Sequence, residues 1–225
     1  MGYFELVRES FPALLRGLGV TLELWGLTLL FGAILGVLIA LARVYGNKYL
    51  YYVATGYVEL IRGTPMLVQL FIIYYGLGDV GIFIKPFLAA IVAFVINTAA
   101  YQAEYFRGAI QSIRGGQIEA AHALGMSRAQ VIRRIVLPQA LRLVIPSWSN
   151  EAIVMLKATS LAFMVTVQEL LAIGKLISSR NYRSLEVFSM VAILYLIVVL
   201  FFTQLLDMIE KKVRTPGIGG KALGA

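Results

Sequence analysis

The chain has 225 residues, of which 60% are hydrophobic and only 14% are charged, and its formal net charge at pH 7 is +8. A soluble domain carries about a quarter charged residues, so the composition excludes an ordinary soluble protein and predicts an integral membrane protein surrounded by lipid. Cysteine is absent and histidine occurs once, which excludes disulfides, thiol chemistry and a metal site built from these residues. In a membrane protein the positive charge indicates basic cytoplasmic loops rather than nucleic acid as a partner.

The apolar segments set the expected architecture. Residues 2–16 mix charges of both signs with apolar residues, which predicts an amphipathic helix at the membrane interface. A helix of about 20 apolar residues crosses a ~30 Å hydrocarbon core. Five segments qualify, the fourth being shorter and more polar: 18–42, 49–77, 86–106, 142–161 and 187–206. With no internal repeat and no soluble domain, residues 1–225 are expected to form one all-α, polytopic transmembrane domain.

The second apolar segment contains a helix-breaking sequence, Gly63-Thr64-Pro65. Proline lacks an amide hydrogen and disfavours helix at the preceding residue, so the span is expected to unwind or kink there. Exposed backbone is tolerated within a membrane only beside protein or a water-filled cavity, and transporters bind substrates at such breaks. Arg62 could bind a substrate carboxylate there, or it could form a permanent ion pair with Glu59 or Glu151.

Two further polar residues are expected deep in the membrane. Counting about 1.5 Å per residue from Leu143, Glu151 lies near the bilayer midplane, with Asn150 beside it. A buried carboxylate needs a partner, which is either a basic group such as Arg62 or a cationic substrate. Asn97 is also deep enough to line a pore, although an interhelical hydrogen bond explains it equally simply. These residues, with Arg62, Gly63 and Thr64, form the candidate substrate site.

A polar, arginine-rich stretch, residues 119–138, separates the third and fourth apolar segments. Alanines favour helix up to Leu124, and Gly125 supplies a left-handed residue that ends it. Ser127 and Gln130 have the spacing of a capping box, so a second, amphipathic helix is expected to follow. Pro138 either breaks that helix or opens the next one.

Basic residues are distributed unevenly about the five segments, which predicts an orientation. Twelve fall on one side: Arg43, Lys48, Arg107, Arg114, Arg128, Arg133, Arg134, Arg142, Lys211, Lys212, Arg214 and Lys221. Six fall on the other: Arg8, Arg16, Lys85, Lys175, Arg180 and Arg183. The richer side is expected in the cytoplasm, together with the polar stretch and the C-terminus, and the N-terminus outside.

The polar stretch resembles the EAA loop of the membrane-spanning subunits of ABC importers. The residues that carry the resemblance are Glu119, Ala120, Ala121, Gly125, Ile135, Leu137 and Pro138. The resemblance implies that residues 109–138 form a cytoplasmic coupling loop, which docks into a cleft on a separate ATP-hydrolysing subunit. The docking face is then expected at the small and apolar residues Ala120, Ala121, Leu124 and Gly125.

The rest of the chain resembles permeases of polar amino acid ABC importers of the histidine, arginine, glutamine and opine group. The resemblance rests on residues 59–65, Gln69, 74–76, 116–117, 137–140, 149–151 and 157–161. It implies a five-helix permease core in a bacterial inner membrane. It also implies a second permease subunit, two ATPases and an extracytoplasmic binding protein.

The substrate that the resemblance implies is a basic amino acid or an opine, with glutamine or another polar amino acid as the alternative. The chain itself has no phosphate-binding GxxxxGK[ST] sequence, because Gly219-Gly220-Lys221 is followed by Ala222. No catalytic residue, cofactor or metal is therefore expected here, and ATP and magnesium belong to the partner subunit. An ion-coupled secondary carrier and a membrane scaffold remain as competing hypotheses.

Overall fold

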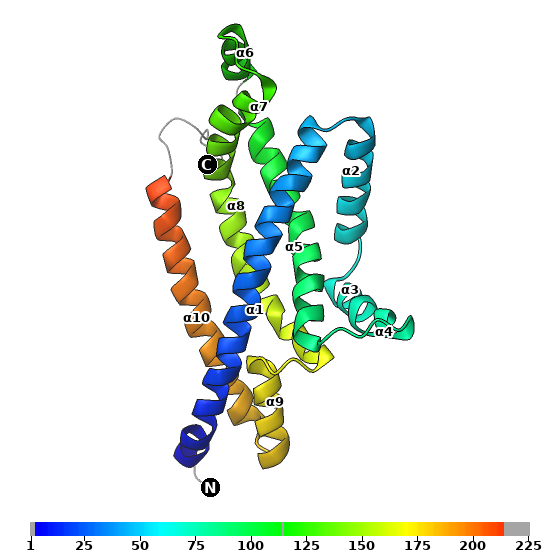
Figure 1. Ribbon diagram of the computed structural model, residues 1–225. Helices are drawn as coiled ribbons and strands as arrows, with labels where there is room; N and C mark the ends of the chain where they lie inside the picture. The colour runs from blue at the N-terminus through cyan, green and yellow to red at the C-terminus, as the bar shows by residue number, and fades with distance from the viewer. Residues whose placement is uncertain (1–2, 114, 214–225) are drawn as a thin grey trace.

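A computed structural model describes residues 3–113 and 115–213, in which all regular secondary structure is helical. Three of the basic residues, Arg114, Arg214 and Lys221, lie outside the described residues, and so does the Gly219–Lys221 sequence. The helices run lengthwise through an elongated bundle (Figure 1). The all-α class predicted from composition is confirmed.

The first helix, α1, is longer than expected. It runs without interruption over Tyr3–Tyr45, so the residues expected to form an interfacial helix are helical but are not separated from the first span. Leu6 and Leu14 are fully buried and pack in one cluster with Leu170 and Val187 of two later helices. The apolar face of this N-terminal stretch is therefore covered by protein, and the polar residues between are what made the sequence resemble an interfacial helix.

The second apolar segment is broken where the sequence predicted. Helix α2 (Lys48–Arg62) ends before Gly63, and the chain resumes as α3 (Met66–Phe71), a π-helical turn η1 (Ile72–Gly76) and α4 (Leu77–Asp79). The two halves meet at an angle of 104°. This is a sharp redirection of the backbone, so the simpler alternative of a plain packing kink does not describe it.

Helix α5 (Pro86–Gln111) begins at its proline and is the most buried of the long helices. After the polar stretch, a π-helical turn η2 (Ile132–Val136) leads into α8 (Leu137–Ala158), which passes into a 3-10 helix η3 (Thr159–Val165). Pro138 opens α8, which resolves the two alternatives for that residue. Helix α10 (Ser184–Val213) completes the bundle.

Helix α9 (Leu170–Asn181) was not anticipated from the sequence. Its first turn is capped by Glu169, whose carboxylate accepts hydrogen bonds from the amides of Leu171 and Ala172 at 2.9 and 2.7 Å. Its end is marked by Tyr182 in the left-handed conformation. Twelve residues with polar groups among them do not satisfy the length criterion for a span, and an acidic cap is a weak signal on its own.

By length and composition, α1, α5 and α10 can each cross a membrane, and the described chain holds up to five crossings if each bent helix pair counts as one. The two bent pairs are α2 with α3–α4, and the helix over Arg128–Val165 with α9. In Figure 1 the first turns of α1 lie beside α9 at one end of the bundle, and the polar stretch stands at the other. The fold is that of a polytopic helical membrane protein.

Helices α1 and α5 approach closely because α1 carries two glycines four residues apart, Gly32 and Gly36. A Cβ atom at Gly36 would lie 2.8 Å from Cβ of Gln102 and 3.2 Å from the backbone of Ala99 and Ala103. Small residues on both helices allow this packing, and in lipid such close van der Waals contact is a main source of helix association. The α1–α5 pair is therefore the most extensive helix–helix contact of the bundle.

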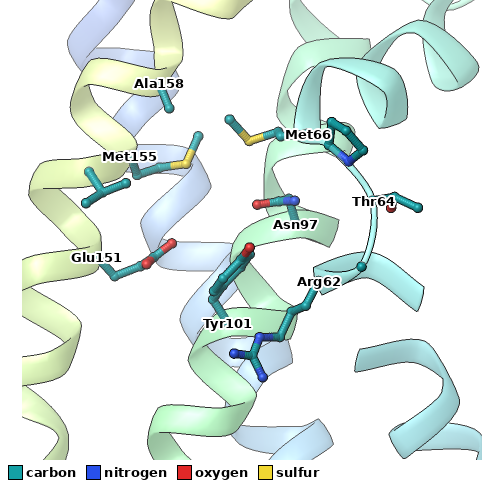
Figure 2. Close-up of a pocket in the computed structure, with 11 residues that line it drawn as sticks. Arg62, Thr64, Met66, Asn97, Tyr101, Glu151, Met155 and Ala158 are labelled. Atoms are coloured by element: carbon teal, nitrogen blue, oxygen red, sulfur yellow. The ribbon is translucent and has the colours of Figure 1, made fainter. Parts of the chain in front are cut away.

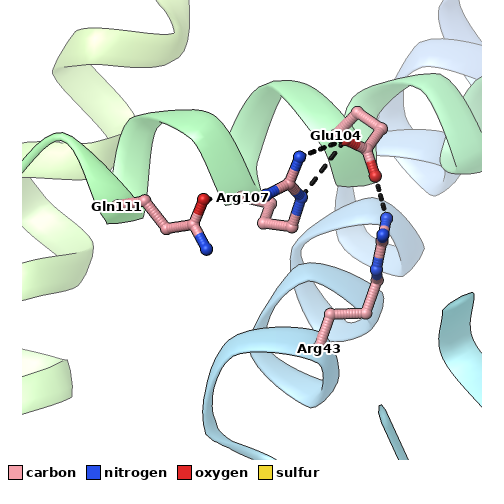
Figure 3. A network of polar contacts seen from close by, with 4 residues as sticks. All are labelled: Arg43, Glu104, Arg107 and Gln111. Atoms are coloured by element: carbon pink, nitrogen blue, oxygen red, sulfur yellow. Dashed lines mark hydrogen bonds and ion pairs between the residues drawn. The ribbon is translucent and has the colours of Figure 1, made fainter. Parts of the chain in front are cut away.

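An ion-pair network joins the same two helices near the end of α1 (Figure 3). Arg43 of α1 forms an ion pair with Glu104 of α5, and Arg107 Nη2 lies 2.7 Å from the other carboxylate oxygen of Glu104. Arg107 also donates a hydrogen bond of 2.7 Å to Gln111. Glu104 is therefore the shared acid that pairs with two arginines and ties α5 to α1.

The close approach predicts that Gly36→Ala destabilises the protein, because the new methyl group meets backbone atoms that cannot move aside. Overpacking of this kind costs about 1–3 kcal/mol. The measurement is the thermal unfolding midpoint in detergent. Gly26→Ala is the matched control, because it lies on the same helix and its Cβ would have no neighbour within 4 Å. Equal midpoints for the two variants would contradict this account of α1–α5 packing.

Candidate functional site

A pocket of about 490 Å³ lies where the break after α2 faces α5 and α8 (Figure 2). The break itself supplies one wall through residues 62–66, and Asn97 and Tyr101 of α5 supply another. The third wall is α8. Its lining residues are Glu151, Val154, Met155 and Ala158. Five of the six residues expected at the substrate site therefore line one cavity: Arg62, Gly63, Thr64, Asn97 and Glu151.

Asn150 is the exception. It is an exposed residue of α8 and does not line the pocket, although Glu151 next to it does. Successive residues of an α-helix are rotated by about 100° about its axis, so Asn150 and Glu151 point in different directions. Tertiary packing brings Glu151 and not Asn150 to this pocket, and a role for Asn150 at the substrate site stays a prediction.

Glu151 is 7% exposed, and its described hydrogen-bond donor is the hydroxyl of Tyr105, 3.2 Å from Oε2. Of the ion pairs between described residues, none includes Glu151 or Arg62. The alternatives in which Arg62 is permanently paired with Glu151 or Glu59 are therefore wrong for this structure. The carboxylate faces the pocket with a neutral partner and without a cation.

Arg62 ends α2 at the edge of the pocket and is exposed. Its guanidinium carbon lies 5.3 Å from the centre of the Tyr101 ring, a distance at which the cation is attracted to the ring face. Figure 2 shows Arg62 and Glu151 on different walls, with Tyr101 between them. The pocket thus presents one positive and one negative group to a molecule inside it.

The broken backbone is held by Gln69, which the sequence reading did not single out as a structural residue. Its amide nitrogen lies 2.7 Å from the carbonyl of Ile61, 3.1 Å from that of Thr64 and 2.8 Å from the Thr64 hydroxyl. Its amide oxygen accepts a 2.9 Å hydrogen bond from Asn97. The interhelical hydrogen bond expected for Asn97 is confirmed, and the same residue also lines the pocket.

Tyr101 and Tyr105 are the other residues that sequence reasoning missed. They follow Asn97 at intervals of four residues on α5, so they lie on the same face of that helix. That spacing was a usable signal. The signal was difficult to recognise because the chain has 12 Tyr and 12 Phe. Most of these are expected in a membrane protein at the membrane–water interfaces.

A second candidate region is the elbow, defined here as residues 115–131, which stands at the opposite end of the bundle from α9 (Figure 1). It consists of α6 (Gly115–Ala123) and α7 (Arg128–Val131). Gly125 has φ of +79°, and the amide of Met126 bonds back to Ala121 at 3.1 Å, which closes α6. Ser127 and Gln130 form the capping box that the sequence predicted.

The exposed part of this region differs in one place from the expected docking face. Glu119, Ala120, Leu124, Gly125 and Pro138 are exposed, and Leu124 is 84% exposed. Leu137 is half-buried. Ala121 is only 3% exposed and packs with Val131 and Val136, so its assignment to an exposed docking face is wrong. Ile135 is half-buried against the same cluster.

Ala121 and Ile135 instead fasten the elbow to the bundle. The cluster that contains them also includes Ala40 of α1 and Phe106 of α5. Movement of the elbow would therefore also displace the ends of these helices. Within residues 3–113 and 115–213, no group of three or more His, Asp or Glu side chains gathers where it could hold a metal ion.

A polytopic bundle with a broken helix beside a charged pocket, and with a helical elbow at one end, defines a membrane-embedded transport subunit. The chain belongs to the family described as binding-protein-dependent transport system inner membrane component, whose model matches residues 32–215. It is a permease subunit of an ABC importer and not an enzyme, because in this family the ATPase is a separate subunit. It resides in the membrane as a multi-pass protein.

Three comparisons define its similarity. It is 42% identical to the nopaline transport system permease protein NocM of Agrobacterium fabrum, covering 92% of this chain and 90% of that one. It is 40% identical to the glutamine transport system permease protein GlnP of Escherichia coli K12, with 94% and 97% covered. A solved structure described as an amino acid ABC transporter with histidines matches with a TM-score of 0.86, 37% identity, and 94% and 99% covered.

Proposed function

We propose that this permease imports an amino acid, and that the pocket at the break after α2 holds the substrate during passage. The relatives reported above are named for nopaline and glutamine, which supports amino acids and their opine derivatives as the substrate class. A cavity of about 490 Å³ is large enough for a single amino acid or an opine.

The single observation that carries a more specific substrate is Glu151. A buried carboxylate without a cationic partner costs several kcal/mol, and a bound cation offsets that cost. Arg62 on another wall can bind a substrate carboxylate through two parallel hydrogen bonds. A basic amino acid or an opine supplies both groups: its carboxylate pairs with Arg62 and its cationic group with Glu151.

Glutamine is the second candidate. Asn97 and Thr64 place an amide and a hydroxyl on the pocket wall, and these groups can hydrogen-bond a neutral side-chain amide. In that case Glu151 would pair with the α-ammonium group, which every amino acid carries. The two candidates make different predictions for Glu151. If the substrate is basic, the charge of Glu151 is needed only for transport of substrates with cationic side chains, whereas if the substrate is glutamine, that charge is needed for every amino acid.

Glu151→Gln is therefore expected to lower uptake of arginine and lysine at least about tenfold, because a charge-assisted hydrogen bond contributes about 1.5–3 kcal/mol. Uptake of glutamine should change far less. The measurement is uptake of radiolabelled arginine, lysine, histidine and glutamine into proteoliposomes that contain the permease with its ATPase and binding protein.

The control for this experiment is Glu23→Gln, which removes a carboxylate from an exposed position of α1 away from the pocket. It should transport like the wild type. Equal losses for glutamine and arginine in the Glu151→Gln variant would contradict recognition of a cationic side chain. Uptake without ATPase or binding protein would instead support an ion-coupled carrier.

We infer that the elbow is the surface on which the partner ATPase docks. Its exposed residues Ala120, Leu124 and Gly125 form the contact, and closure of the ATPase dimer on ATP moves the elbow and so alternates access to the pocket. ATP and magnesium are bound by that partner. A second permease subunit and an extracytoplasmic binding protein complete the assembly.

Gly125→Val should abolish ATP-driven uptake, because the left-handed conformation at this residue costs an ordinary L-residue about 1–2 kcal/mol and a β-branched one more. Gly125→Asn is the matched variant, since asparagine tolerates this conformation, and it should keep most uptake. A Cβ atom here would meet nothing within 4 Å in this chain, and both variants add one toward the partner, so the difference between them reports backbone conformation. Full uptake by the valine variant would refute the docking role.

The proposed orientation places the elbow in the cytoplasm and the N-terminus outside. Among described residues, nine basic side chains lie toward the elbow's end: Arg43, Lys48, Arg107, Arg128, Arg133, Arg134, Arg142, Lys211 and Lys212. The six at the other end are those expected outside. Cytoplasmic loops carry the excess of Lys and Arg, so the richer end faces the cytoplasm. For a bacterial protein the membrane is the inner membrane.

Single-cysteine labelling tests this orientation, because the chain has no cysteine of its own. Leu124→Cys in intact spheroplasts should react with a membrane-permeant maleimide but not with an impermeant one. Asn181→Cys, exposed at the end of α9, should react with both. The reverse pattern would place the elbow outside, where no ATPase could reach it.

A further inference from the structure

Besides the 2.8 Å hydrogen bond that Gln139 Nε2 of α8 donates to Gln117 Oε1 of α6, the elbow makes a polar contact with α1 through Arg128. The Nη2 atom of Arg128 donates a 2.8 Å hydrogen bond to the backbone carbonyl of Tyr45, the last residue of α1. The guanidinium carbon also lies 5.3 Å from the centre of the Tyr45 ring. One side chain of the elbow therefore binds both the backbone end and the terminal ring of the longest helix.

The contact with α1 explains why an arginine can occupy this position. Arg128 is the first residue of α7, where the helix dipole disfavours a positive charge. The end of α1 reverses that preference, because its last carbonyls lack intrahelical donors and carry partial negative charge. The local cost at α7 is thus offset by a contact that exists only when the elbow sits on the end of α1.

This contact lies on a continuous path to the pocket. From Arg128 the chain is helical through α7, η2 and α8, and α8 carries Glu151. On the other side, α1 is joined to α5 through Arg43 and Glu104, and α5 carries the pocket residue Tyr101. The elbow is consequently connected to two walls of the pocket. It continues directly into α8, which forms one wall, and it is linked through Arg128 and α1 to α5, which forms another.

The path through α8 contains a local irregularity. The five residues Ile132–Val136 form a π-helical turn between α7 and α8, and such turns interrupt the regular hydrogen-bond ladder. The regular hydrogen-bond ladder is therefore interrupted between the elbow and the helix that carries Glu151. The contact with α1 gives the elbow a second connection, which leads to the wall formed by α5.

We propose that Arg128 is a positioning residue for coupling: it holds the elbow on the end of α1, so that a displacement of the elbow also moves the α1–α5 pair. The inference rests on the proposed docking of the ATPase at the elbow. Its contribution is distinct, because Arg128 faces α1 whereas the docking surface faces the partner. Loss of Arg128 then separates ATP hydrolysis from transport without preventing assembly.

The test compares Arg128→Gln, Arg128→Lys and the control Arg142→Gln in proteoliposomes with ATPase and binding protein. Arg142 is an exposed cation of α8 toward the same end, so its loss removes the same charge. Three quantities are measured for each variant: recovery of the ATPase with the purified permease, substrate-stimulated ATP hydrolysis, and substrate molecules transported per ATP.

For Arg128→Gln, we expect normal recovery of the ATPase and at least about a fivefold fall in substrate transported per ATP, the lower end of typical coupling between sites. Arg128→Lys should restore the ratio only in part, because an ammonium group can donate to the carbonyl but stacks less well on the ring than a planar guanidinium. Tyr45→Leu removes the ring and keeps the carbonyl, and its ratio should be intermediate.

Two results would overturn the proposal. If Arg128→Gln transports as much per ATP as the wild type, or no less than Arg142→Gln, then the contact with α1 has no role in coupling. If Arg128→Gln fails to retain the ATPase, then Arg128 belongs to the docking surface instead. Failure of the docking hypothesis itself is recognised separately, by full uptake in Gly125→Val.

Discussion

Backbone polar groups cannot be left unpaired in hydrocarbon, and this constraint organises the pocket of the permease. The sharp break between α2 and α3 frees carbonyl groups of Ile61 and Thr64, and both are bonded by the amide of Gln69. Gln69 is in turn fixed by Asn97 of α5. The same hydrogen bonds that satisfy the broken helix therefore set the distance between two pocket walls, so the site's shape and the helix break are one feature.

The position of the third wall, α8, is set by its contacts with α5. Glu151 accepts a hydrogen bond from Tyr105 of α5, and the hydroxyl of Thr98 on the same helix lies 3.2 Å from the sulfur of Met155. Helix α5 thus contacts α1 through its small residues and through Glu104, and it contacts α8 through polar groups of Tyr105 and Thr98. At the far end of α8, the buried side chains of Ala121 and Val131 fasten the elbow to this arrangement. A displacement of the elbow would reach the pocket through these packed helices and through the contact of Arg128 with α1.

Sequence reasoning succeeded where the cause is local. The break at Gly63-Thr64-Pro65, the left-handed Gly125 and the capping box at Ser127 each follow from the chemistry of a few adjacent residues, and all three are present. It failed where the location of a residue depends on which other helices bury it. Residues 2–16 resembled a separate interfacial helix because nothing in the sequence shows that Leu6 and Leu14 are covered by α9 and α10. Ala121 looked like a surface alanine because its burial depends on the cluster that it forms with Val131 and Val136.

The sequence by itself determined that this is an all-helical membrane protein, and its motifs resembled those of the importer permeases to which it belongs. Hydrophobic length, helix breakers and the spacing of motif residues are properties of the chain alone. Only the tertiary structure decided that Glu151 has Tyr105 and not Arg62 as its neighbour, that Asn150 turns away from the pocket, and that Arg128 binds the end of α1. These contacts join residues tens of positions apart, and their partners depend on helix rotation and crossing, which no local pattern specifies.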